Sequence, residues 1–181
     1  MHAKYDVLSN ISADNPFKTP LIAWVDIGYY REMTSCSGAG QFELMPPPDF
    51  DGSSVAFTRV GPDDVLTRDV SDIVRNNLVW VGGGMLIAQP GVILQFATDY
   101  KSFVRRLLKL GLSNTDQQMI AAMYSQTMKS ERRVQLQTYK CGQDEWFCLG
   151  YTARDEGLRI QRRQGQTMYP SRHFSMLKTL S

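Results

Sequence analysis

Residues 21–28 read Leu-Ile-Ala-Trp-Val-Asp-Ile-Gly, and this stretch carries most of the information about the fold. Its first five residues form an uninterrupted apolar run, which is typical of a strand buried on both faces of a parallel or mixed sheet. Asp26 ends the run abruptly, and Gly28 follows two residues later. We therefore predict that residues 21–25 form a central strand, with Asp26 at its carboxyl end facing a cleft.

Apolar runs and helical periodicity alternate along the rest of the chain. Residues 90–110 carry an apolar stripe with helical spacing, and Gly111 follows as a stop. Thr115 and Gln118 match the two ends of a capping box, so a second helix is predicted over residues 115–127 with Thr115 as its N-cap. Strands alternating with helices predict an α/β fold. Strands are expected at residues 55–57 and 134–136, and two further apolar runs, residues 78–81 and 85–88, are separated by three glycines.

Length and composition indicate one globular domain followed by a tail. The chain has 181 residues, of which 43% are hydrophobic and 21% are charged, so it can bury a core of its own. From Arg154 onward the sequence becomes polar and basic, with little periodicity. We therefore expect a domain over residues 1–153 and a poorly ordered basic tail over residues 154–181.

Charge, cysteine spacing and hydropathy argue against several function classes. A formal net charge of +2 does not suggest a nucleic-acid partner. No stretch reaches the roughly 20 consecutive apolar residues that a membrane span needs. Cys36, Cys141 and Cys148 form no CxxC pair, so we expect free thiols rather than a zinc site. Free thiols and the lack of a secretion signal favour a cytoplasmic location, with the secretory pathway as the alternative if a signal lies upstream.

Asp26 is the first candidate for chemistry. A carboxylate at the end of a buried strand can hold Mg²⁺ or Mn²⁺ against substrate phosphates. Gly28 would then let a diphosphate approach the backbone closely. The plain structural alternative is that Asp26 only ends the strand or caps a turn, which is the more common arrangement.

Two further candidates have equally plain alternatives. Gly82, Gly83 and Gly84 separate two apolar runs and could present backbone N–H groups to an anion or let a sugar lie flat against the chain. A hairpin turn or a bulge would explain them as well. Asp116 could point into a cleft and orient a substrate hydroxyl or act as a base, although the helix dipole alone favours an acid at that position.

Taken in order, these motifs resemble the HtrL/YibB family. Residues 15–17 (Asn-Pro-Phe) and 24–31, with Trp24, Asp26, Gly28 and Arg31, resemble the family's "NPF … W-[IV]-D-x-G … R" signature. The glycines at 82–84 resemble its "GG" segment before a long aromatic-rich helix. Asp116-Gln117 and, later, Trp146-Phe147 resemble its "DQ … WF" close. The resemblance covers residues 5–151.

The family is similar to GT-A glycosyltransferases, and this similarity implies a partial GT-A-like three-layer α/β fold with a mixed sheet flanked by helices. It implies that Asp26 holds Mn²⁺ or Mg²⁺, and that Asp116 is catalytic and lies with Gln117 on the acceptor side. The three motifs should converge on one pocket. The residues implied in donor binding are Trp24, Asp26, Gly28, Gly82, Gly83 and Gly84.

The implied function is transfer of a sugar from a nucleotide-sugar donor to the hydroxyl of a glycan or other acceptor. Catalysis would rest on positioning and on electrostatic stabilisation of the leaving diphosphate. GT-A enzymes begin with a βαβ half that holds the nucleotide base, and we expect that half before residue 1. The alternative, from a different class, is a non-catalytic sugar- or nucleotide-binding domain or interaction module.

Overall fold

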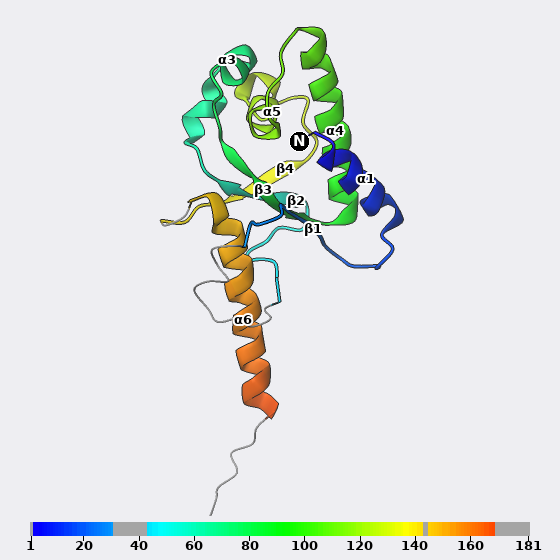
Figure 1. The fold of residues 1–181 in the computed structure, drawn as a ribbon, viewed down its shortest axis with the longest axis vertical. Helices are drawn as coiled ribbons and strands as arrows, with labels where there is room; N and C mark the ends of the chain where they lie inside the picture. Colours follow the sequence, from blue (N-terminus) through cyan, green and yellow to red (C-terminus); the bar gives the residue numbers. More distant parts are fainter. Residues whose placement is uncertain (1, 31–42, 143–144, 169–181) are drawn as a thin grey trace, which may run out of the picture.

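The fold is built on a four-stranded mixed sheet, seen in a computed structural model that describes residues 2–30, 43–142 and 145–168 (Figure 1). The strand order is β1-β3-β2-β4. Strand β3 pairs antiparallel with β1 and β2, whereas β4 pairs parallel with β2. The predicted α/β class with a mixed sheet is confirmed. The strands are β1 (Ile22–Val25), β2 (Ser54–Arg59), β3 (Val81–Ala88) and β4 (Gln135–Tyr139).

Helices cover both faces of the sheet (Figure 1). On one face lie α1 (Lys4–Asp14), α3 (Val70–Arg75), α4 (Pro90–Lys109) and α5 (Asp116–Met123). On the other face, α6 (Cys148–Met168) begins against β2 and β3 and then extends away from the sheet. Short 3₁₀ turns lie at η1 (Asp63–Thr67), η2 (Gln126–Met128) and η3 (Glu145–Phe147).

The alternation of side chains along the inner strands fills a core on each face. Phe57 of β2 and Leu86 of β3 belong to the larger core, together with Phe96 of α4. Ala56 and Met85, one residue away in each strand, belong to a smaller core beneath α6. Because both faces are covered, these strands are continuous apolar runs rather than alternating ones.

The predicted central position of residues 21–25 is wrong, because β1 is an edge strand. It pairs only with β3 among the described residues, and Ala23 is exposed. The run is nevertheless apolar because Trp24 packs against the larger core and Val25 against the smaller one. An uninterrupted apolar run indicates that both faces of a strand are covered. It does not indicate whether the strand has one or two neighbours in the sheet.

The two predicted long helices are present, although the second is shorter than expected. Helix α4 spans Pro90–Lys109, and α5 starts at Asp116 with Thr115 at the N-cap position. The Thr115 side chain makes no capping hydrogen bond to the backbone, and its hydroxyl donates to the Gln118 side chain instead. The predicted capping box is therefore not formed, even though it marked the start of the helix correctly.

Helix α6 continues beyond Arg154, where the sequence predicted a poorly ordered tail. Its backbone is anchored early, since the Met45 N–H donates to the Ala153 carbonyl over 3.1 Å. Further along, Glu156 and Arg159 form an ion pair three residues apart. Local pairs of this kind support a helix without an apolar stripe, which explains why periodicity missed it. Residues 169–181 of the predicted tail lie outside the described residues.

Candidate functional site

The three glycines lie inside strand β3, where they form a bulge. The pairing of β2 with β3 shifts register between Phe57 and Thr58, which pair with Leu86 and Gly82 respectively. Residues 83–85 are therefore extra on the β3 side, as in a β-bulge. Of the structural alternatives that the sequence left open, a bulge is the one observed.

The bulge brings two other segments close to the backbone of β3. A Cβ atom on Gly83 would lie 2.8 Å from Asp116 Oδ2, and one on Gly84 would lie 2.9 Å from the Tyr29 ring. A side chain at either position would therefore collide with a neighbouring residue, which explains why both positions are glycine. The Asp26 N–H also donates to the Gly84 carbonyl over 2.8 Å, so the end of β1 is fastened to the bulge.

A pocket of about 300 Å³ opens beside this bulge. It is lined by the segment after β1, by Gly84 of the bulge, by Gln117 of α5 and by the aromatic pair of η3. Its volume is at the lower end of the range for small-molecule sites, about 300–1,000 Å³. The lining residues are Asp26, Ile27, Gly28, Tyr29, Gly84, Gln117, Trp146 and Phe147.

The pocket combines one carboxylate and one amide with aromatic walls. Asp26 is exposed and accepts a hydrogen bond from Trp24 Nε1 over 2.6 Å. The Trp146 side chain is 49% exposed, whereas Tyr29 is buried with its ring centroid 5.0 Å from that of Phe147. Burial raises the pKa of Tyr29 above its ordinary value.

Asp116 lies behind the pocket, in a buried ion pair with Lys4 of α1. Lys4 is 8% exposed and Asp116 only 2%. Lys4 Nζ also donates to the Gly83 carbonyl over 2.7 Å, and the Tyr5 hydroxyl donates to Asp116 Oδ2 over 3.3 Å. Burial and, after it, the Asp116 charge raise the pKa of Tyr5 well above its ordinary value. The Asp116 carboxylate is therefore engaged with protein groups on the far side of the bulge.

The three motifs do meet around the β3 bulge, but they do not all reach the pocket. Asp26, Gly28, Gly84 and Gln117 line it. Trp24 does not line it but donates a hydrogen bond to Asp26, and Gly82 lies next to Trp146. Gly83 and Asp116 lie behind it, and Arg31 lies outside the described residues.

Several residues of the site had no assigned role at the level of sequence. Tyr29 and Trp146 belong to the quoted motifs, so their presence in the pocket had a sequence signal. Lys4 had none, because a lysine in an amphipathic N-terminal helix is ordinarily solvated.

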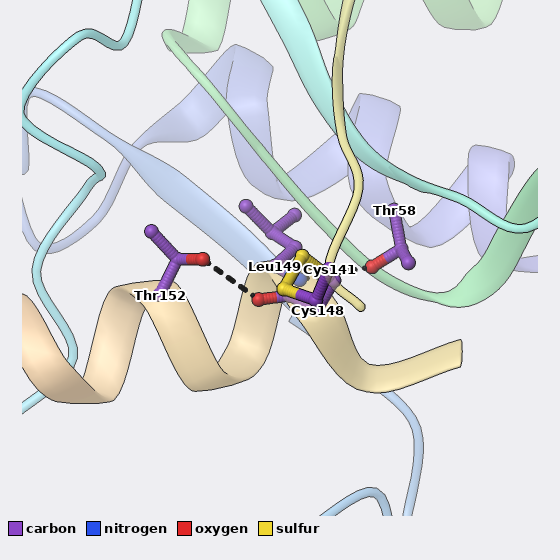
Figure 2. Close-up of a disulfide and its surroundings, with 5 residues drawn as sticks. All are labelled: Thr58, Cys141, Cys148, Leu149 and Thr152. Atoms are coloured by element: carbon purple, nitrogen blue, oxygen red, sulfur yellow. Dashed lines mark hydrogen bonds between the residues drawn. A yellow bond between two sulfur atoms is a disulfide. The ribbon is translucent and has the colours of Figure 1, made fainter. Parts of the chain in front are cut away.

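A disulfide bond joins Cys141 to Cys148 around η3, so the expectation of free thiols is wrong for these two residues. Figure 2 shows the bond at the start of α6, where Leu149 N donates to Thr58 Oγ1 over 3.1 Å. The two Cα atoms are 5.4 Å apart, within the usual range for a disulfide. The bond closes the segment that presents Trp146 to the pocket. Cys36 lies outside the described residues.

The donor set for a metal ion is small. Among the described residues no group of three or more His, Cys, Asp or Glu side chains could hold a metal. Asp26 is the carboxylate that lines the pocket. Mg²⁺ commonly uses one or two protein carboxylates together with substrate phosphates. The described residues thus offer a single carboxylate at this pocket and no preformed metal cage.

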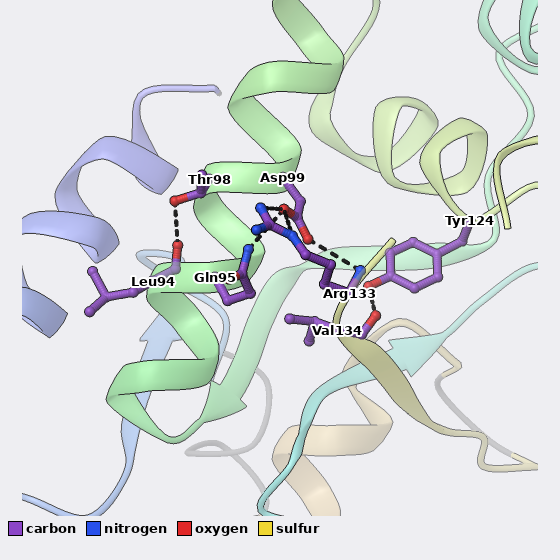
Figure 3. A network of polar contacts seen from close by, with 7 residues as sticks. All are labelled: Leu94, Gln95, Thr98, Asp99, Tyr124, Arg133 and Val134. Carbon is purple, nitrogen blue, oxygen red and sulfur yellow. Dashed lines mark hydrogen bonds and ion pairs between the residues drawn. The ribbon is translucent and has the colours of Figure 1, made fainter. Parts of the chain in front are cut away.

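A second hollow, of about 240 Å³, lies between α4 and the segment before β4. Figure 3 shows its polar network, in which Asp99 accepts from Gln95 Nε2 and from Arg133 Nε, each over 2.9 Å. Arg106 and Glu131 form another ion pair at its rim, with an N–O distance of 2.6 Å. These charged groups pair with one another and hold the segment before β4 against α4. Because they are already paired, this hollow is a weaker candidate for a ligand site.

Comparison with known proteins gives one family match. The model of a family described as "Bacterial protein of unknown function (HtrL_YibB)" matches residues 1–152. Neither a curated protein nor a solved structure matches the chain. No helix in the described ranges is long and apolar enough to cross a membrane.

Proposed function

We propose, on the premise that the chain belongs to the HtrL/YibB family, that it binds the sugar of a nucleotide-sugar donor in the Asp26 pocket and transfers it to an acceptor hydroxyl. The observation that carries this proposal is the composition of the pocket. An exposed carboxylate, an amide and an exposed indole line the same pocket, together with further aromatic rings.

A sugar ring has an edge of hydroxyl groups and faces of C–H groups, and the pocket offers a partner for each. The Asp26 carboxylate accepts hydrogen bonds, and the Gln117 amide both donates and accepts them. The Trp146 indole provides a flat apolar surface for the C–H face. Convergent polar groups on an apolar lining are the usual design of a small-molecule site.

The size and the rim of the pocket support binding of the sugar rather than the whole donor. A volume of about 300 Å³ suits one small ring, so the nucleotide would extend beyond the pocket. Gly28 lies at the rim with φ of 83°, a conformation that favours glycine. Its missing side chain leaves room for a diphosphate to pass close to the backbone.

A divalent cation forms part of the proposal. Asp26 would hold Mn²⁺ or Mg²⁺ as the single protein carboxylate, and the cation would offset negative charge on the leaving diphosphate. The residues of the chain supply orientation. In this proposal Gln117 contacts the acceptor. We infer that Asp116 only positions Gln117, its neighbour in the chain, because the Asp116 carboxylate is already paired with Lys4.

The second candidate function is sugar binding without transfer. It is favoured by the single carboxylate that the described part of the chain contributes to the pocket, since a second acid would be needed there to act as a base. Product analysis separates the two functions: transfer releases a nucleoside diphosphate, whereas binding alone leaves the donor intact.

The disulfide bears on where this activity would take place. Disulfides persist in oxidising compartments and are rare in reducing cytosol. The bond between Cys141 and Cys148 therefore supports the secretory alternative over the cytoplasmic one. We infer that the chain works in an oxidising compartment.

The proposal is tested by calorimetric titration with UDP-glucose, GDP-mannose and ADP-glucose, with Mn²⁺ and with EDTA. At least one should bind the wild-type chain, and Asp26→Asn should weaken that binding by about tenfold or more, equivalent to about 1.4 kcal/mol. The substitution keeps the shape of the side chain and removes its charge. Asp14→Asn, an exposed site at the end of α1, serves as the matched control. Equal affinities in the two variants would rule out the role given to Asp26.

A further inference from the structure

We propose that Lys4, in the N-terminal helix α1, is a positioning residue that sets the shape of the pocket without lining it. The inference rests on the proposed function only for the identity of the ligand, because the geometry of the pocket can be measured without one.

The Lys4 ammonium joins two segments at the residue that precedes a pocket residue in each. It donates to the carbonyl of Gly83, and Gly84 lines the pocket. It also contacts the Asp116 carboxylate, and Gln117 lines the pocket. The Lys4 ammonium therefore fixes the distance between strand β3 and the first turn of α5, next to the residue of each that lines the pocket.

The bulge explains why the strand needs such a support. Residues 83–85 are out of register with β2, so the regular ladder does not hold them from that side. Lys4 supplies a donor to the Gly83 carbonyl within this interrupted stretch. A buried carbonyl without a donor is costly, and a cationic donor makes a stronger bond than a neutral one.

Burial restricts the ion pair to this arrangement. Lys4 and Asp116 are both more than nine-tenths buried, and the Tyr5 hydroxyl bonds to the same carboxylate oxygen. Neither charge can turn to water without opening the contact of α1 with the sheet. Buried ion pairs often add little stability over apolar side chains of the same size, so geometry is the stronger reason for this one.

The test compares Lys4→Met with Lys101→Met. Lys101 is the matched control because its pair with Asp6 likewise ties α1 to a neighbouring element, here α4, but is open to solvent, with Lys101 29% and Asp6 64% exposed. Native-state amide exchange at residues 83–85 and 116–118 is measured against exchange in strand β2. In Lys4→Met we expect exchange at these two segments to rise about tenfold more than exchange in β2, as local opening requires. In Lys101→Met we expect no such difference.

A conservative variant and a binding measurement test the same role of Lys4. Lys4→Gln, which retains an N–H donor of nearly the same reach, should recover part of the lost protection, and it replaces Lys4→Met if that variant fails to fold. For whichever of UDP-glucose, GDP-mannose and ADP-glucose binds best, Lys4→Met should lower affinity about tenfold while Lys101→Met does not. If none binds the wild type, the proposed function loses its support, and exchange alone decides the role of Lys4. Uniform acceleration across the fold, or none, would overturn it.

Discussion

Replacing Asp116 by alanine is expected to destabilise the protein by about 3–5 kcal/mol, because the Lys4 ammonium would remain buried without its counter-charge. Both side chains of the pair are more than nine-tenths buried. The Tyr5 hydroxyl would lose its acceptor at the same time. Chemical denaturation followed by circular dichroism measures the change in the free energy of unfolding.

The control for this loss is the pair between Lys101 and Asp6, in which the Asp6 side chain is 64% exposed. Asp6→Ala should cost about 1 kcal/mol or less, because exposed ion pairs are screened by solvent. The contrast between the two aspartates isolates the effect of burial. If Asp116→Ala and Asp6→Ala shifted the free energy of unfolding equally, Asp116 would not be the buried partner described above.

The second large effect is expected on removing the disulfide. Cys141 and Cys148 are seven residues apart, and closing such a loop lowers the entropy of the unfolded chain by an amount equivalent to about 2.5 kcal/mol. The double variant Cys141→Ser/Cys148→Ser should be destabilised by about that amount. Because Trp146 lies within the closed segment, its fluorescence should also change as η3 loosens.

A reductant provides the matched control for the disulfide. It should lower the thermal midpoint of the wild-type chain and leave that of the double serine variant unchanged. A wild-type midpoint that is unchanged after thiol titration has confirmed reduction would show that the bond between Cys141 and Cys148 contributes no stability.

The inner strands and the long helix could be predicted from sequence because their patterns are local. The apolar runs at 55–57 and 85–88 lie in strands β2 and β3, and the stripe over 90–110 marks α4. The position of β1 could not be predicted in the same way. Its apolar run records that both faces of the sheet are covered, whereas an edge position depends on which strands pair with it.

The candidate site could be predicted only in part, because its parts come from four distant segments. Asp26, Gly84 and Gln117 followed from motifs, and the structure brings all three to one pocket. The burial of Asp116 depends on Lys4, which lies far from it in the chain and carries no local signal. The disulfide depended on the turn through η3, which spacing alone does not reveal.

The most direct test of the central claim is a footprint of the bound donor by hydrogen–deuterium exchange. The chain is compared with and without saturating nucleotide-sugar, using the member of the panel that binds best. We predict protection at residues 26–29, at the bulge 83–85 and at η3, because these segments surround the pocket. Protection confined to the hollow beside α4, with none at Asp26 or Trp146, would contradict the claim that this pocket holds the sugar.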